Sequence, residues 1–177
     1  PKETEVQAVI LAASRGSNLG ELTKDIPKCM IDIRGQPLLR RLTSTLNQAN
    51  IRNIAVVRGY KKATVNLPSI DYLDNDAYEN TGELTSLNAA NKYLKGTTVI
   101  AYGDILFRHH ILDQLLEAEG DIVLVVDQQG GKIACGISSY AASDVIVIKG
   151  LRSDAIYKVL GHQYGQEILH RNNMVLL

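Results

Sequence analysis

The most constraining feature of this sequence is a nearly unbroken apolar run close to its start, over residues 6–13. An uncharged run of this length predicts a strand covered on both faces, as in the middle of a parallel sheet. Residues 14–28 follow, with Gly16, Gly20 and Pro27 among polar side chains, and no helical pattern is evident there. Because long connections in compact domains are usually functional or mobile, we expect this loop to carry function.

Helix and strand patterns then alternate along the chain. Apolar residues at helical spacing predict helices at 37–50, 84–94, 111–116 and 153–160. Short apolar runs predict further strands at 54–57, 70–73, 97–102, 122–126 and 145–148. The alternation predicts an α/β fold that is doubly wound, with a mostly parallel sheet and helices on both faces.

Size and charge narrow the classes of function. At 177 residues we expect a single domain over 1–177. Nineteen basic residues balance nineteen acidic ones, which argues against nucleic acid or an anionic membrane as a partner and requires any phosphate site to be local. Two cysteines without framework spacing favour a reducing, cytoplasmic location. No apolar run approaches the roughly 20 residues that span a bilayer, and residues 1–5 lack the pattern of a signal peptide.

The loop after the first strand lies where ligands of an open parallel sheet bind, beyond the carboxyl ends of the strands. Its small residues let backbone N–H groups approach phosphate oxygens, and its basic residues neutralise a triphosphate. The nucleotide-binding candidates here are Leu11, Ala12, Ala13, Ser14 and Gly16, with charge from Arg15, Lys24 and Lys28. The alternative interpretation is a solvated loop with scattered charges.

The same loop carries a family resemblance. Residues 11–19 read Leu-Ala-Ala-Ser-Arg-Gly-Ser-Asn-Leu, and Leu-Thr at 22–23 and Pro-Lys at 27–28 follow. This run resembles the signature of the nucleotidyltransferase family, Leu-Ala-Ala-Gly-x-Gly-x-Arg-Leu with Leu-Thr and Pro-Lys behind it. The similarity continues through residues 33–38, Ile-x-Gly-x-Pro-Leu. It implies a Rossmann-like nucleotidyltransferase fold.

Two positions depart from that signature: Ser14 stands where the family has a glycine, and Asn18 where it has an arginine. Residues 25–30, 57–61 and 80–87 are similar to the cytidylyltransferases of phosphonate and phosphocholine assembly, some of which are fused to phosphoenolpyruvate phosphomutase. This resemblance implies transfer of CMP from CTP to 2-aminoethylphosphonate or phosphocholine. Few aromatic residues and no tryptophan favour the aminoethylphosphonate-like acceptor over a choline headgroup.

Lys28, Arg15 and Asp104 are the residues expected to assist the chemistry. Lys28, with Arg15 nearby, is expected to stabilise charge that grows at the α-phosphoryl group. Asp104 closes the strand at 97–102 and matches the family's metal-binding aspartate, which implies Mg²⁺ as the cofactor. The alternatives are a surface lysine and an aspartate that caps a turn. The acceptor is already a nucleophile, so no general base is required.

The segment before the helix at 84–94 offers groups for a base edge. Amide, hydroxyl and backbone groups there suit such hydrogen bonds, from Asn80, Thr81, Gly82 and Ser86. A helix cap is the equally weighted alternative, with Thr81 as the capping residue and Glu83 near the positive end of the helix dipole.

The sequence gives weaker indications of function for the other reactive residues. Adjacent His109 and His110 point in different directions on a helix, which disfavours a metal pair. Cys29 is expected in the core, because no activating base is near. Asp127 ends a predicted strand and either faces the site or caps a turn. The family's second metal-binding aspartate is not located, although Asp144 and Asp154 are candidates by order.

Alternative functions remain open at the level of sequence. The chain is short for this family, which suggests an incomplete acceptor-binding part at its C-terminal end, with a fusion partner or a dimer partner. A sugar-1-phosphate nucleotidyltransferase would prefer UTP, GTP or dTTP, whereas a degenerate nucleotide-binding domain would bind triphosphate without turnover. A dinucleotide-binding domain is disfavoured, because no Gly-x-Gly-x-x-Gly opens a helix after the first strand.

Overall fold

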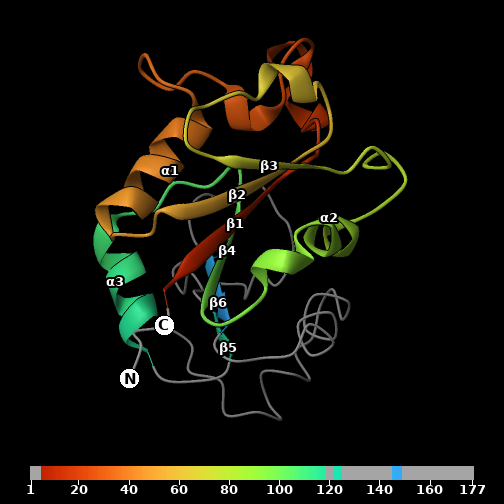
Figure 1. Ribbon diagram of the computed structural model, residues 1–177. Coiled ribbons are helices and arrows are strands. Elements are labelled where there is room, and N and C mark those ends of the chain that lie inside the picture. The colour runs from red at the N-terminus through yellow and green to blue at the C-terminus, as the bar shows by residue number, and fades with distance from the viewer. Residues whose placement is uncertain (1–4, 119–121, 125–144, 149–177) are drawn as a thin grey trace, which may run out of the picture.

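The computed structural model describes residues 5–118, 122–124 and 145–148 (Figure 1). Its strands are β1 Gln7–Ala12, β2 Asn53–Arg58, β3 Asp71–Asp74, β4 Thr98–Tyr102, β5 Ile122–Leu124 and β6 Val145–Ile148. Its α-helices are α1 Leu38–Gln48, α2 Glu83–Ala89 and α3 His109–Glu117. Short 3-10 helices occur at η1 Ser17–Thr23, η2 Lys28–Met30, η3 Lys62–Thr64 and η4 Asn91–Tyr93.

The strands form one sheet in the order β3-β2-β1-β4-β6-β5. β1 is parallel to β2 and β4, and β2 is parallel to β3, whereas β6 runs antiparallel to both β4 and β5. The predicted α/β fold with a mostly parallel sheet is therefore confirmed. In register, Leu11 lies opposite Val57 on one side and Tyr102 on the other, so the carboxyl ends of these strands meet at one edge.

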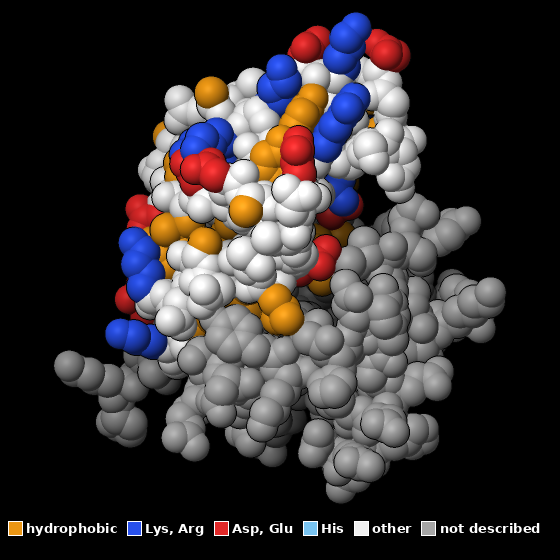
Figure 2. Space-filling model, turned by 90° about the vertical axis from the view of Figure 1, so that its right-hand side faces the viewer, with side chains coloured by type: hydrophobic (Ala, Val, Ile, Leu, Met, Phe, Trp, Pro, Cys, Tyr) orange, Lys and Arg blue, Asp and Glu red, His pale blue; other side chains and the backbone are white. Residues whose placement is uncertain are grey.

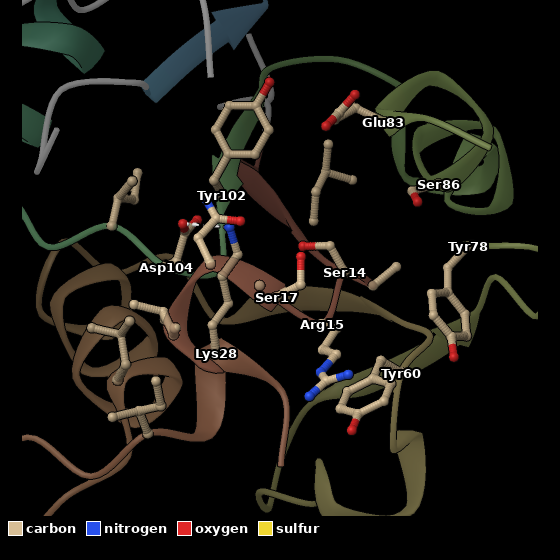
Figure 3. Close-up of a pocket in the computed structure, with 18 of the residues that line it drawn as sticks. Ser14, Arg15, Ser17, Lys28, Tyr60, Tyr78, Glu83, Ser86, Tyr102 and Asp104 are labelled. Carbon is tan, nitrogen blue, oxygen red and sulfur yellow. Dashed lines mark hydrogen bonds and ion pairs between the residues drawn. The ribbon is translucent and has the colours of Figure 1, made fainter. Parts of the chain in front are cut away.

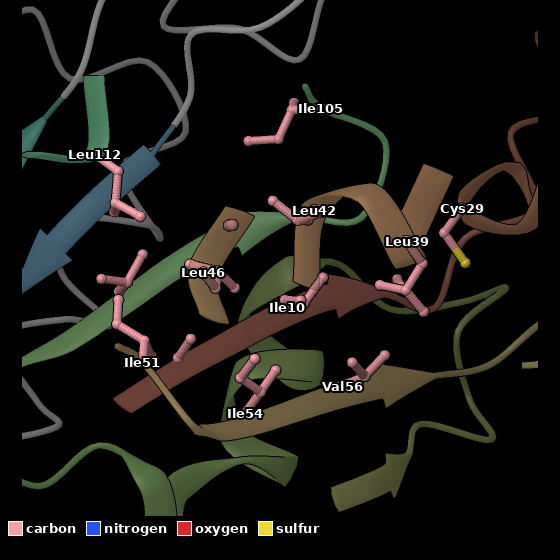
Figure 4. Close-up of a cluster of buried hydrophobic side chains, with 14 of the residues drawn as sticks. Ile10, Cys29, Leu39, Leu42, Leu46, Ile51, Ile54, Val56, Ile105 and Leu112 are labelled. Carbon is pink, nitrogen blue, oxygen red and sulfur yellow. The ribbon is translucent and has the colours of Figure 1, made fainter. Parts of the chain in front are cut away.

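Helices cover both faces of the sheet, as predicted (Figure 1). Alternate residues of β1 serve the two faces: Ile10 packs into the cluster with α1 and α3, and Val9 packs into the cluster with α2 and η4. Figure 4 shows the first cluster, with Leu39, Leu42 and Leu46 of α1 over the sheet. Each fully buried leucine contributes about 1.5–3 kcal/mol through burial, so the apolar stripe fixes α1 on the sheet.

Two segments differ from the sequence prediction. The helix predicted at 84–94 ends at Ala89, and a separate 3-10 turn, η4, follows it. The loop at 14–28 holds the short helices η1 and η2, because left-handed glycines at Gly16 and Gly20 allow tight turns that no apolar repeat announces. The helix predicted at 153–160 lies outside the described residues. No helix in the described part is long and apolar enough to cross a membrane.

Candidate functional site

A pocket of about 920 Å³ opens at the carboxyl ends of β1 and β4, between the loop at 14–28 and α2 (Figure 3). This size is in the range of small-molecule sites. Figure 2 shows the side of the molecule that carries α2, where basic and acidic side chains are mixed. Among the described residues on that face there is no broad patch of one sign, so we look for charge selectivity in the individual residues that line the pocket.

Three loops are tied together directly beyond the strand ends. Gly103 N–H donates to the Leu11 carbonyl at 2.9 Å, and Tyr60 N–H donates to the Ala13 carbonyl at 2.9 Å. A side chain at Gly59 would place its Cβ 2.6 Å from that same carbonyl oxygen, so glycine is required for the approach. The loops after β1, β2 and β4 therefore form one wall of fixed shape.

The loop after β1 is held by a single buried threonine. Thr23 Oγ1 donates to the carbonyls of Gly16 at 3.1 Å and Gly20 at 3.4 Å, and Arg15 Nε donates to the Thr23 carbonyl at 3.2 Å. Thr23 is fully buried. These bonds fold the loop back on itself, so that Ser14 and Arg15 face the pocket (Figure 3).

Lys28 and Asp104 meet on the floor of the pocket. Lys28 Nζ lies 2.6 Å from Asp104 Oδ2, with side chains 24% and 33% exposed, so both remain accessible to a ligand. Gly16 makes room for the lysine, since a Cβ there would lie 2.8 Å from Lys28 Cδ. The pair brings a cation suited to phosphate and a carboxylate suited to a hard metal ion into direct contact.

Asp104 fits a magnesium ion that is shared with a ligand. No cluster of three His, Cys, Asp or Glu side chains that could hold a metal occurs within the described residues. Magnesium, however, is usually bound by one or two carboxylates together with waters and substrate phosphates. One carboxylate beside the loop at 14–18 is therefore a donor set that a ligand's phosphate oxygens would complete.

On the opposite side of the pocket, the buried Asn75 organises two hydroxyl groups. Its Nδ2 donates to Thr81 Oγ1 at 3.0 Å and to Ser86 Oγ at 3.1 Å, while its Oδ1 accepts from Ala77 N–H at 3.1 Å. Asn75 is only 5% exposed. Sequence analysis missed this residue, because its partners lie six and eleven positions further along the chain.

The structure brings most of the predicted site residues together. Those that line the pocket are Leu11, Ala13, Ser14, Arg15, Gly16, Lys28, Thr81, Gly82, Ser86 and Asp104. Ala12 and Asn80 do not line it. Ala12 is buried on the α1 side of the sheet, close to the position a Cβ at Gly103 would take, and Asn80 is exposed.

The helix-cap alternative for Thr81 is wrong. The residue that caps α2 is Gly82, with no side-chain hydrogen bond to the helix, and Thr81 Oγ1 donates instead to the Ala77 carbonyl at 2.8 Å. Glycine at the cap leaves the Thr81 hydroxyl at the pocket wall. That placement agrees with the binding interpretation of this residue.

An aromatic wall was not anticipated from sequence. The rings of Tyr60 and Tyr78 lie edge to face, with centroids 6.2 Å apart, and both line the pocket. The Arg15 guanidinium lies 5.5 Å from the centroid of Tyr60, close enough for a cation–π contact. Tyr60 sits within the cytidylyltransferase-like segment at 57–61, which was the available signal.

The remaining candidates lie away from the pocket or outside the description. Cys29 is 1% exposed, and burial raises the pKa of its thiol to about 12, so the prediction of a core cysteine is confirmed. His109 Nδ1 lies 2.8 Å from Asp113 Oδ2 within α3. The candidates Asp127, Asp144 and Asp154 lie outside the described residues.

Comparison with known proteins identifies a matching family profile and related sequences. The profile of the MobA-like NTP transferase domain matches residues 8–174. A CTP:phosphoglutamine cytidylyltransferase from Campylobacter jejuni is 31% identical over 139 residues, which cover 72% of this chain and 55% of that protein. The chain thus spans about half the length of this relative. A glutamate 5-kinase from Dehalococcoides mccartyi is 47% identical over 58 residues, a third of this chain but only 16% of the kinase.

Solved structures share the fold. A CTP:phosphocholine cytidylyltransferase from Streptococcus pneumoniae superposes with a TM-score of 0.65 at 18% identity, over 98% of this chain and 89% of that chain. A Bacillus anthracis protein described as a glucose-1-phosphate thymidylyltransferase superposes with a TM-score of 0.68 at 17% identity, over 97% and 86%. At such identities the likeness establishes the Rossmann-like fold alone.

Proposed function

Because the chain belongs to the MobA-like NTP transferase domain family, we propose that it transfers a nucleoside monophosphate from a triphosphate to a small acceptor. The finer proposal is Mg²⁺-dependent transfer of CMP from CTP to a phosphonate or phosphate of the 2-aminoethylphosphonate kind, with release of pyrophosphate. The observation that carries it is the convergence of the loop at 14–18, Lys28 and Asp104 in one pocket.

The loop after β1 supplies the triphosphate site in this proposal. Ser14, with a small side chain, and Gly16, with none, line the pocket together with Arg15, which brings a guanidinium to it. Because Arg15 is braced by the Thr23 carbonyl and the Tyr60 ring, it is positioned before a ligand arrives. Preorganised donors stabilise phosphate charge without a reorganisation cost during the reaction.

Lys28 and Asp104 mark the place of the α-phosphate. An oxygen of the acceptor attacks the α-phosphorus, the new P–O bond forms, and pyrophosphate leaves with the electron pair of the broken bond. Lys28 stabilises the negative charge that develops on the phosphoryl oxygens. Mg²⁺ held by Asp104 and the phosphates would neutralise charge and align the acceptor. The acceptor is anionic and nucleophilic at neutral pH, so no side chain needs to remove a proton.

Support for cytosine comes from the relatives and from the pocket wall. The proteins from C. jejuni and S. pneumoniae are both described as CTP-dependent. The Ser86 hydroxyl accepts from Asn75 and keeps its proton to donate to a base edge, and the Thr81 hydroxyl, which donates to the Ala77 carbonyl, keeps a lone pair to accept. Tyr60 and Tyr78 supply aromatic surface that a flat base can stack against.

The experiment is a pyrophosphate-release assay with Mg²⁺ and each of CTP, UTP, GTP and dTTP. The acceptors are 2-aminoethylphosphonate, phosphocholine and glucose 1-phosphate. Release that is specific to CTP with either nitrogen-containing acceptor supports the finer proposal. Preference for another triphosphate with glucose 1-phosphate would replace it with a sugar-1-phosphate nucleotidyltransferase. Triphosphate binding without release in every combination would indicate a degenerate domain.

A further inference from the structure

One end of the pocket carries an acidic and an aromatic side chain that the binding of a triphosphate does not use. Figure 3 shows Glu83 and Tyr102 at the same end of the pocket, apart from Arg15 and Tyr60 at the other end. Glu83 is the first residue of α2, and Tyr102 is the last residue of β4. Two elements that are distant in sequence therefore place these side chains at one subsite.

The carboxylate of Glu83 stands out among the acidic groups that line the pocket. Asp104 pairs with Lys28, and Glu79 accepts a hydrogen bond from the Tyr78 hydroxyl at 3.1 Å. Within the described part of the chain, no ion pair or hydrogen bond involves the Glu83 side chain. A carboxylate in a pocket that receives a polyanion repels that ligand, unless another part of the bound molecules is cationic.

Tyr102 places this subsite next to the reacting centre. It lies two residues before Asp104 at the end of β4, and both residues line the pocket, with the Tyr102 ring on the Glu83 side of Lys28 and Asp104 (Figure 3). A tyrosine ring attracts ammonium groups over its face, and a facing carboxylate adds a charge-assisted hydrogen bond. A carboxylate and a ring together suit a compact organic cation.

The other end of the pocket suits the nucleoside. Tyr60 and Tyr78 follow β2 and β3, on the side of β1 away from β4. The two hydroxyl groups held by Asn75 flank Glu83 in the sequence, with Thr81 before α2 and Ser86 within it. A nucleotide whose base stacks on Tyr60 and Tyr78 leaves the end of the pocket with Glu83 and Tyr102 open (Figure 3). The second substrate therefore approaches the α-phosphorus from that end.

From this arrangement we infer that Glu83 and Tyr102 bind a cationic amine on the acceptor and so select an aminated phosphonate or phosphate over an uncharged one. The inference rests on the proposed function, since it assigns one end of that pocket to the acceptor. It makes Glu83 a specificity residue that contacts the part of the acceptor remote from the bond being formed.

The test compares acceptors that differ only in charge. 2-Aminoethylphosphonate and propylphosphonate have nearly the same shape, with an ammonium group in one where the other has a methyl group. The wild-type chain should prefer the amine by about tenfold or more in kcat/KM, as expected for a charge-assisted contact. Glu83→Gln should reduce that preference at least severalfold and leave the KM for CTP unchanged. Glu79→Gln changes the other pocket carboxylate that is not proposed to bind a metal, and this variant should keep the preference for the amine.

An unchanged acceptor preference in Glu83→Gln would overturn the inference. If the KM for CTP rises at the same time, Glu83 reads the cytosine amino group instead. A role limited to the α2 terminus would lower the melting temperature without changing the ratio.

Binding separates this inference from the proposed function. If the wild-type chain shows no turnover, saturation-transfer NMR of each phosphonate with CTP present measures the same preference directly. Selective binding of the amine that Glu83→Gln abolishes would sustain the inference while the proposed function fails. Equal binding of both phosphonates by the wild-type chain would overturn it.

Discussion

Lys28 Nζ and Asp104 Oδ2 lie 2.6 Å apart, although 76 positions separate the two residues in the sequence. The lysine comes from η2 and the aspartate from the segment after β4, so only the folded sheet brings them together. Each occupies the place of the other's proposed ligand: the carboxylate stands where a phosphate oxygen would lie, and the ammonium stands where a metal ion would lie. Binding of a metal–triphosphate complex must therefore separate the pair.

Substitution of either member should abolish most turnover and leave the fold intact. Lys28→Met and Asp104→Asn are each expected to lower kcat by about a hundredfold or more, since each removes a charge aimed at the phosphates. Melting temperatures should change little, because a partly exposed ion pair contributes roughly 0–1 kcal/mol. Steady-state pyrophosphate release and thermal unfolding measure the two effects. Lys24→Met is the control, because Lys24, which was expected to supply charge to the triphosphate, is exposed and does not line the pocket. Full activity in Lys28→Met would refute the role of Lys28.

The ion pair also predicts competition with a metal ion. In Lys28→Met the Asp104 carboxylate is no longer neutralised, so nucleotide-free protein should bind Mn²⁺ severalfold more tightly than the wild type. Electron paramagnetic resonance of Mn²⁺ titrations reports this without any turnover. Asp104→Asn in the same background should remove the gain. Equal affinities in the wild type and in Lys28→Met would show that Asp104 is not the metal ligand.

We expect activity to require glycine at position 16, because the Lys28 side chain packs against this residue. At φ +76 the residue has a left-handed backbone, and an alanine Cβ would also press against Lys28 Cδ. Gly35 has φ +84 with open space around it, so Gly35→Ala carries the backbone strain alone. Both variants should lose about 1 kcal/mol of unfolding free energy, and only Gly16→Ala should also lose most of its kcat. Equal kcat values for the two alanine variants would contradict the packing role.

Asn75 should control nucleotide affinity without touching the triphosphate. Asn75→Ala removes the donor that holds Thr81 and Ser86, so we expect the KM for CTP to rise about tenfold with a smaller change in kcat. Loss of a buried hydrogen-bonding partner should also destabilise the fold by about 1–3 kcal/mol. Asn80→Ala is the matched control, because that exposed residue does not line the pocket. A larger rise in KM for Asn80→Ala than for Asn75→Ala would reverse these assignments.

Cys29 gives a prediction for alkaline pH. Burial raises the pKa of its thiol from 9.0 to about 12, so the folded state holds this proton more tightly than the unfolded state. Its stabilising contribution is complete below pH 9 and is lost as the pH rises toward 12. Urea unfolding between pH 8 and pH 10.5 should show falling stability in the wild type and a shallower fall in Cys29→Ala. Parallel curves would contradict this origin.

The elements that could be predicted from sequence are those with strong local patterns. The apolar run at 6–13 and the leucines of α1 announce a buried strand and its covering helix, because one period or one continuous run decides each. The loop after β1 could be recognised from its fixed spacings, which resemble a family signature. That resemblance indicated Arg15, Lys28 and Asp104 as site residues. Arg15 and Asp104 lie shortly after β1 and β4, whereas Lys28 begins η2 and was singled out by the resemblance.

What could not be predicted depends on contacts that follow no repeating sequence pattern. Thr23 and Asn75 act through side-chain hydrogen bonds within a single connecting segment. Tyr60 and Tyr78 form their ring contact only when the segments after β2 and β3 meet at one edge of the sheet. Likewise, Ala12 was expected at the ligand, but the alternation of side chains along β1 turns it toward the core. The end of the predicted helix at 84–94 was misplaced, because its apolar spacing continues into η4 after the α-helix ends.

The central claim is that this pocket joins CMP to an acceptor, and the product itself tests it most directly. The chain is incubated with CTP, Mg²⁺ and 2-aminoethylphosphonate, and ³¹P NMR follows the phosphorus signals. We predict a pair of coupled signals from a new phosphonate–phosphate anhydride, together with free pyrophosphate, and neither in the presence of Asp104→Asn. Unchanged CTP and phosphonate signals with the wild-type chain, under conditions in which CTP binds, would contradict the account.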